Sequence, residues 1–171
     1  MSGPSSSSSS SSPRVRLPLL DRLLDADPDA PRDPPLTQPL AVEALRAAVA
    51  RDLEALLNAR RRRVPLDPRL VELPRSVVGY GIPDPTAGTF SQEETRQALA
   101  REVEAAIRRF EPRLTNVHVT APKLERDATD RTLRLRVEAV LRTDPVPEGI
   151  AFETVLRPST LDVAVRETAA P

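Results

Sequence analysis

The hydrophobic period of the sequence changes at Pro112, and this change constrains the fold more than any other feature. Before Pro112, in residues 39–60 and 90–110, apolar residues recur every three to four positions, as in amphipathic helices. After Pro112, apolar and polar residues alternate, as in strands with one buried face. Helices first and strands second, on short connections, predict an α+β fold: N-terminal helices packed on a mainly antiparallel three- to four-stranded C-terminal sheet.

Each of the two long helical segments carries one apolar stripe. The stripe of the first is formed by Val42, Leu45, Val49, Leu53, Leu56 and Leu57, and that of the second by Leu99, Val103, Ile107 and Phe110. Ser91 and Glu94 have the spacing of a capping box, which predicts the start of the second helix, and Glu104 and Arg108 form an i,i+4 pair. Residues 60–63 are four arginines, which we interpret as a solvated helix C-terminus where positive charge complements the helix dipole, not as a phosphate site.

The clearest strand prediction lies in residues 132–142. Its inward positions are Leu133, Leu135, Val137, Ala139 and Leu141, and its charged residues lie on the other face. Residues 149–156 and 161–167 predict two further strands joined by a hairpin turn at 157–160. His118 alternates with Val117 and Val119, so we expect this only histidine on the solvent side of a strand.

The remaining segments divide the chain. We expect residues 1–16 to form a disordered Ser-rich tail, residues 17–38 a short docking helix with a Pro-rich linker, and residues 39–168 a single α+β domain. The leucines of 18–26 have helical spacing, and this short helix either packs on its own domain or docks into the groove of a partner. Near residue 76 a helical turn ends in Gly79 and Gly81, which can take positive φ, and Pro83 prevents its continuation.

Composition excludes several functions. Lys+Arg and Asp+Glu balance at 25 each, which argues against broad nucleic-acid binding because such binding needs a large positive field. The chain contains no cysteine, so disulfides, thiolate metal sites and a cysteine nucleophile are absent. We find neither a secretory signal nor an apolar run long enough to span a membrane, so we expect a cytoplasmic protein without direct membrane insertion.

A search for catalytic groups predicts no enzyme. The candidate carboxylates for glycoside hydrolysis are Asp84, Glu93, Glu94 and Glu111, but Arg113 would keep Glu111 ionised, which is the wrong state for a general acid. No cluster has the spacing of a metal site, and we expect no cofactor. Glu111, Pro112 and Arg113 instead predict a helix-to-strand corner with a fixed acid and base, suited either to binding another protein or to pinning its own fold.

Three stretches together resemble the TssE family of type VI secretion baseplate subunits, which is related to the wedge and sheath-initiator protein of contractile phage tails. They are "PLLDRLLD" at 18–25, "RDLEALLNARRR" at 51–62 with "SVVGYGIPD" at 76–84, and "IRRFEPRL" at 107–114. The resemblance covers about residues 17–167, with "IAFETVL" and "LDVAV" similar to the final hairpin of the family. The Ser-rich N-terminus, the residues Val78, Gly79 and Ile82, and Pro158 depart from the family pattern.

The resemblance implies a structural role, despite an old "lysozyme-like" label on the family. It implies binding to the wedge subunits TssF and TssG, with TssK in the same assembly, and to the sheath subunits TssB and TssC. It also implies that Glu111, Pro112 and Arg113 anchor the domain to the wedge helices, and that the sheet initiates sheath assembly by strand pairing. The alternatives are a regulatory interaction module similar to the anti-adaptor IraD, or the equivalent wedge subunit of a phage-like contractile device.

Overall fold

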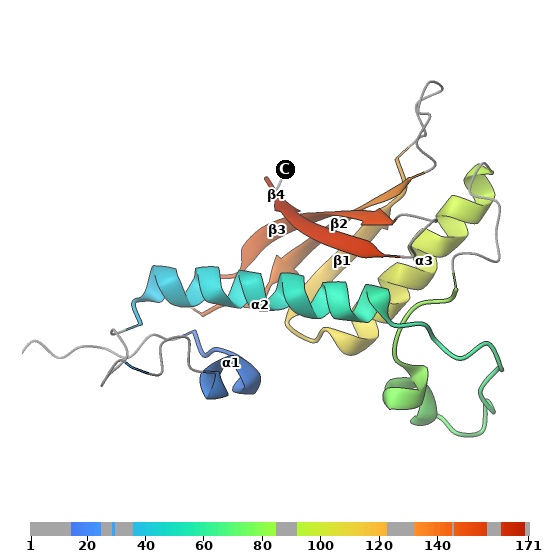
Figure 1. Ribbon diagram of the computed structural model, residues 1–171, viewed down its shortest axis with the longest axis horizontal. Helices are drawn as coiled ribbons and strands as arrows, with labels where there is room; N and C mark the ends of the chain where they lie inside the picture. Colours follow the sequence, from blue (N-terminus) through green and yellow to red (C-terminus); the bar gives the residue numbers. More distant parts are fainter. Residues whose placement is uncertain are drawn as a thin grey trace, which may run out of the picture.

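The computed structural model describes residues 15–24, 29, 36–84, 92–122, 132–144, 146–156 and 162–169. In these ranges three α-helices precede a four-stranded sheet, so the predicted α+β class is confirmed (Figure 1). The elements in chain order are α1 Leu19–Leu23, α2 Gln38–Asn58, two short 3₁₀ turns at Leu73–Arg75 and Val77–Gly79, α3 Glu93–Phe110, β1 Leu114–Thr120, β2 Leu133–Leu141, β3 Glu148–Leu156 and β4 Val163–Thr168.

The sheet is an antiparallel meander in the order β1-β2-β3-β4. Val137 in β2 lies opposite Val119 on one side and Phe152 on the other. Every second residue of β2 is buried, from Leu133 to Leu141, as the alternating pattern predicts. The pairing of β1 is irregular between Thr115 and His118, where Asn116 takes a φ of 51°, a left-handed conformation that asparagine tolerates.

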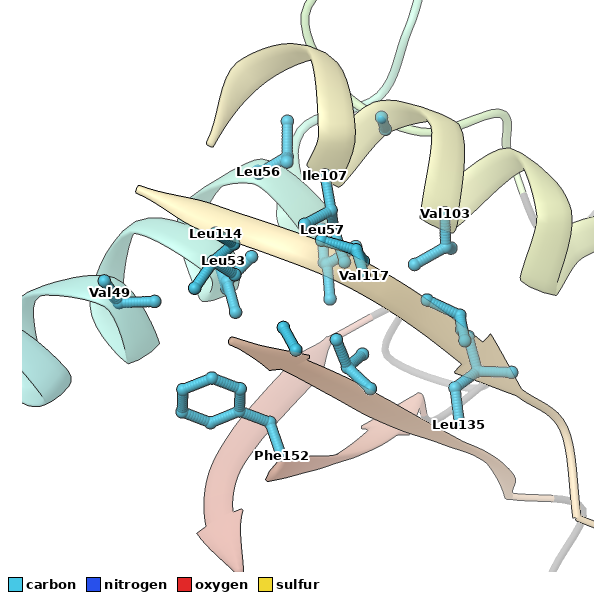
Figure 2. Close-up of a cluster of buried hydrophobic side chains, with 14 of the residues drawn as sticks. Val49, Leu53, Leu56, Leu57, Val103, Ile107, Leu114, Val117, Leu135 and Phe152 are labelled. Carbon is cyan, nitrogen blue, oxygen red and sulfur yellow. The ribbon is translucent and has the colours of Figure 1, made fainter. Parts of the chain in front are cut away.

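The core lies between one face of the sheet and the helices α2 and α3. Helix α3 packs mainly against β1, and α2 against β4. Figure 2 shows Leu53 and Leu57 from α2, Ile107 from α3 and Phe152 from β3 in this cluster. Since aromatic residues are rare in the chain, Leu, Val, Ile and Ala fill most of this space.

The two long helices begin and end close to the predicted positions. Helix α2 has Pro39 in its first turn, where proline suits the start of a helix, and ends two residues before Arg60. The arginines therefore follow the helix; Arg60 hydrogen-bonds the carbonyl of Leu57, and Arg61 pairs with Glu102. For α3 the N-cap position is Gln92, without a side-chain cap, and Ser91 of the predicted capping box lies outside the described residues.

The segment between α2 and α3 depends on two glycines, for different reasons. Gly81 has a φ of +100°, and a Cβ there would lie 2.5 Å from the carbonyl oxygen of Ala59. Gly79 does not take positive φ, so that prediction was wrong; a Cβ at Gly79 would instead lie 2.2 Å from the carbonyl oxygen of Pro74. Because Gly81 has no Cβ, its backbone can lie close to Ala59, and the neighbouring residues Arg60 and Ile82 form a parallel β-bridge that joins this segment to the end of α2.

Helix α1 is a single short turn whose leucines are exposed. Leu19 and Leu23 are 68% and 72% exposed, and the helix contains no buried residue. Its contact with the domain is polar: Asp21 pairs with Arg51 of α2 at 2.5 Å. Val15, just before the helix, is buried in the core cluster. The serine run and the predicted hairpin turn at 157–160 lie outside the described residues.

None of the helices in the described part of the chain has an apolar stretch long enough to cross a membrane.

Candidate protein interface

Residues 111–113 form the corner between α3 and β1, and we refer to them as the Glu-Pro-Arg corner. The α3 helix ends at Phe110, and the N–H of Glu111 still donates to the carbonyl of Ile107. Pro112 follows and cannot continue the helix, because it has no N–H and its ring clashes with the preceding turn. The backbone then enters β1, and the carbonyl of Arg113 accepts a hydrogen bond of 2.9 Å from the N–H of Arg142 after β2.

The side chain of Arg113 folds back onto two carboxylates. Its Nε donates to Oε1 of Glu111 at 2.5 Å, and its Nη2 donates to Oε2 of the same carboxylate, which is a bidentate pair. The same Nη2 donates to Oδ2 of Asp52 in α2 at 2.6 Å. The backbone N–H of Arg113 also donates to Glu111. A charge-assisted hydrogen bond to Asp52 therefore fixes the corner to the C-terminal part of α2.

Burial makes these contacts strong. The side chain of Glu111 is only 6% exposed, while those of Arg113 and Asp52 are 23% and 37% exposed. The hydrogen bond to Glu111, with help from Asp52, raises the pKa of the Arg113 guanidinium, so it stays charged. A buried carboxylate is costly unless it is paired, and here a single arginine supplies the pairing.

The ion pairs continue from the corner to the N-terminal segment. Arg51 contacts Asp52 at 3.2 Å, and its two terminal nitrogens contact the two oxygens of Asp21 in α1. The hydrogen bond from Arg51 lowers the pKa of Asp21, and the same contact raises the pKa of Arg51. Helix α1 and the Glu-Pro-Arg corner therefore share one chain of alternating charges.

A hollow of about 230 Å³ lies beside the corner. Leu53 and Leu56 of α2 line it, together with the rings of Tyr80 and Phe110, whose centroids are 5.2 Å apart in an edge-to-face arrangement. Burial raises the pKa of Tyr80, and the charges of Asp52 and Glu111 add to this effect. The hollow is thus lined by apolar, aromatic and charged side chains.

The other sequence candidates do not gather at this corner. His118 is exposed on β1, as predicted, with its Nδ1 3.5 Å from Glu104. Asp84 pairs with Arg63, and Glu93 and Glu94 lie in the first turn of α3. The predicted pair of Glu104 and Arg108 is confirmed at 2.8 Å. Among the described residues, no group of three or more acidic or histidine side chains could hold a metal ion.

Sequence reasoning missed Asp52, which completes the corner. It is 61 residues away from Arg113 in the chain, and it is one of several charged residues of α2. One weak signal exists: Asp52 precedes Leu53 and stands one turn before Leu56, so it borders the apolar stripe of α2. A carboxylate at the edge of a buried apolar stripe can pair with a positively charged side chain of the element that packs against the stripe.

The fold and the Glu-Pro-Arg corner together indicate which class of protein this is. The domain is a small α+β module whose most buried charged group, Glu111, serves to hold a helix-to-strand corner in one geometry. A profile of the family described as baseplate wedge protein gp25 matches residues 43–146, from α2 to the turn before β3. Because this match spans more than half of the chain, the protein belongs to that family, as the resemblance predicted. No curated protein matches the sequence.

Membership fixes the coarse function. The protein is a structural component of a phage-tail-like baseplate, and it interacts with other baseplate or tail components. The family is a structural one and not a known enzyme class. The matched region includes the whole Glu-Pro-Arg corner and Asp52.

Proposed function

We propose that the protein is the TssE-type subunit of a type VI secretion baseplate. In this role it links the wedge subunits TssF and TssG, with TssK in the same assembly, to the first sheath ring of TssB and TssC, and it initiates the sheath by strand pairing. The assembly forms at the cytoplasmic side of the inner-membrane secretion complex. The wedge family match and the three sequence blocks, at 18–25, at 51–62 with 76–84, and at 107–114, support this assignment.

The observation that carries the wedge contact is the rigid presentation of Arg113. Its guanidinium is fixed by Glu111 and Asp52, yet 23% of the side chain remains exposed. Pro112 is exposed at the tip of the same corner, and the hollow walled by Tyr80 and Phe110 lies beside it. A preorganised surface loses little side-chain entropy on binding, which favours recognition of a partner helix. We therefore assign Glu111, Pro112 and Arg113 as protein-binding residues, with Glu111 acting through Arg113.

The division of the chain is part of the same proposal. We propose that residues 39–168 form the wedge domain, that residues 17–38 provide a docking helix and linker, and that residues 1–16 form a tail, although its residue Val15 is buried in the core cluster. The exposed leucines of α1 favour the docking alternative over packing on its own domain. Asp21 then acts as a tether that keeps this helix near the corner through Arg51.

Binding to purified TssF–TssG tests the proposal. The wild-type protein should be retained, and Arg113→Ala should lose binding. Arg142→Ala is the matched control and should bind normally, because Arg142 lies beside the corner but is not part of the Glu-Pro-Arg triplet. Arg113→Lys keeps the charge but not the bidentate geometry, and it should bind with intermediate affinity. Each variant is checked for folding by circular dichroism. A folded Arg113→Ala that binds normally would exclude the corner as the contact, and a wild type that does not bind would exclude the type VI assignment.

A further inference from the structure

Arg51 of α2 is an exposed arginine that is paired with a residue of the short helix α1. Its Nη1 donates to Oδ1 of Asp21 at 2.5 Å, and its Nη2 donates to Oδ2 of the same carboxylate at 3.1 Å. A guanidinium can bind a carboxylate of any chain in this bidentate geometry. The side chain of Arg51 is 44% exposed, so a second protein can reach it.

Arg51 lies next to the Glu-Pro-Arg corner, because it shares a carboxylate with Arg113. Nε and Nη2 of Arg51 donate to Oδ1 of Asp52 at 3.2 Å, and Nη2 of Arg113 donates to Oδ2 of Asp52 at 2.6 Å. The hydrogen bond from Arg51 is the main cause of the lowered pKa of Asp21, and the charge of Arg113 also contributes. A partner that covers the corner therefore also reaches Arg51.

Helix α1 is held in a way that permits its displacement. It contains no buried residue, and a helix of five residues is marginal without a surface to pack on. Figure 1 shows α1 beside α2, on the side away from the strands. Exposed ion pairs such as that of Asp21 shift an equilibrium by no more than about fivefold in general. Val15 is buried in the core cluster, so α1 can leave Arg51 while the segment stays attached to the domain.

The charge balance at the corner depends on whether α1 is in place. With α1 bound, three carboxylates and two guanidinia are linked, so the cluster carries one excess negative charge: Asp21, Asp52 and Glu111 against Arg51 and Arg113. A carboxylate of a partner is then repelled, and Asp21 already occupies the two nitrogens that it would bind. When Asp21 leaves, the remaining four groups are neutral and these nitrogens become available. Binding of Asp21 and of a partner carboxylate at Arg51 therefore exclude each other.

We propose that Arg51 is a further partner-binding residue, that Asp21 masks it in the free protein, and that a carboxylate of the wedge partner displaces Asp21 from the same two nitrogens. This inference rests on the proposed function and deepens it, because it names the chemical group that the wedge presents beside the Glu-Pro-Arg corner. Asp21 is then a competitor of the partner as well as a tether. Its displacement also releases α1, with its exposed leucines, next to the bound partner.

A first experiment measures the Kd of the full-length protein for purified TssF–TssG with two substitutions of opposite expected effect. Arg51→Ala removes the binding group and should weaken binding about 10-fold. Asp21→Asn weakens the competitor and should tighten binding about threefold. If the ion pair only held α1 in a productive position, both substitutions would weaken binding. Arg62→Ala is the matched control, because it removes the same charge from an exposed position beyond α2 and should leave the Kd unchanged.

A charge exchange separates the ion pair from the binding group. Asp21→Arg/Arg51→Asp keeps an ion pair between α1 and α2 but places a carboxylate where the partner carboxylate should bind, so binding should weaken at least 10-fold. Wild-type affinity in this double variant would overturn the inference. Circular dichroism checks the folding of every variant, and Arg51→Gln, which keeps most of the aliphatic stem, replaces Arg51→Ala if that variant does not fold.

A second experiment tests the mask without any partner, with acetate as a simple carboxylate probe. Acetate is titrated at constant ionic strength, and NMR follows the Nε–H signal of Arg51, with that of Arg62 as the reference. The shift of the Arg51 signal per unit of acetate should be about threefold larger in Asp21→Asn than in wild type. Equal shifts in the two proteins would show that Asp21 does not mask Arg51.

The outcomes separate the inference from the proposed function. Normal binding of TssF–TssG by Arg51→Ala, or weaker binding by Asp21→Asn, overturns the masked site while the proposed function stands. If the wild-type protein does not bind TssF–TssG, the type VI assignment fails and the wedge carboxylate fails with it. The acetate titration then still decides whether Asp21 masks a carboxylate site at Arg51.

Discussion

Replacing Arg113 with alanine should destabilise the fold as well as weaken partner binding. The substitution leaves the carboxylate of Glu111 in place with a side chain that is 6% exposed and has lost its bidentate partner. Removing one member of a buried ion pair costs about 3–5 kcal/mol in general. Arg113 is itself partly exposed, so solvent screens part of this loss, and we expect the free energy of unfolding to fall by about 2–3 kcal/mol.

The cause of this loss can be isolated by changing Glu111 as well. Glu111→Gln removes the buried charge and keeps the shape of the side chain, so Glu111→Gln/Arg113→Ala should be more stable than Arg113→Ala alone. We expect a coupling free energy of about 1.5 kcal/mol in a double-mutant cycle. Arg142→Ala, at an exposed arginine next to the corner, should change stability by less than about 0.5 kcal/mol.

Urea unfolding followed by circular dichroism measures all of these variants at pH 7. A loss of about 2–3 kcal/mol corresponds to a fall in Tm of about 5–10 °C for a domain of this size, which calorimetry can check. The reasoning is refuted if Arg113→Ala unfolds at the wild-type midpoint, or if the two substitutions are additive. In the first case Arg113 acts only at a partner surface.

Other variants test the core, the segment between the helices and the N-terminal tether. Phe152→Ala should lower the free energy of unfolding by about 3–5 kcal/mol in urea melts, because Phe152 is fully buried. Gly81→Ala should cost about 1–3 kcal/mol by the same assay, since φ is +100° there. The hydrogen bond from Arg51 holds the pKa of Asp21 below its usual 3.8, so the ion pair stabilises the contact of α1 above about pH 4 and is lost as the pH falls through the lowered pKa. NMR signals of α1 should report this release at low pH, and Asp21→Asn should abolish the pH dependence.

The fold was predictable because each long element is amphipathic in a single period. The alternation from Leu133 to Leu141 fixes the buried face of β2, and the stripe through Leu53 fixes that of α2. The exact ends of the helices and strands depend on contacts between residues that are far apart in the sequence. The bulge at Asn116 and the role of Gly79 could not be predicted, because each follows from how neighbouring backbones meet and not from local preference.

The candidate site was predictable only in part, for a similar reason. In the sequence, Pro112 marks the end of a helix, and it has a charged residue on either side. Glu111 and Arg113 can pair because they are only two residues apart. Whether Arg113 has a second partner besides Glu111 depends on which turn of α2 the corner packs against. That register is set by the core, so Asp52 was missed although it borders the apolar stripe. The hydrogen bonds between the side chain of Asn58 and the backbone of Val163 were missed as well, because Asn58 appears in the sequence only as the end of a helix.

Helix α2 contacts the Glu-Pro-Arg corner and the outer edge of β4 through separate side chains. Asp52 holds the Glu-Pro-Arg corner, whereas Glu54 and Asn58 hold the outer edge of β4. Steps of two and six residues along a helix turn it by about 200° and 600°, so neither Glu54 nor Asn58 lies directly beneath Asp52. We therefore expect substitutions at the corner to leave the contacts of Glu54 and Asn58 with β4 in place. A variant at Leu53, which packs in the core between them, should instead weaken both sets of contacts by loosening the whole helix.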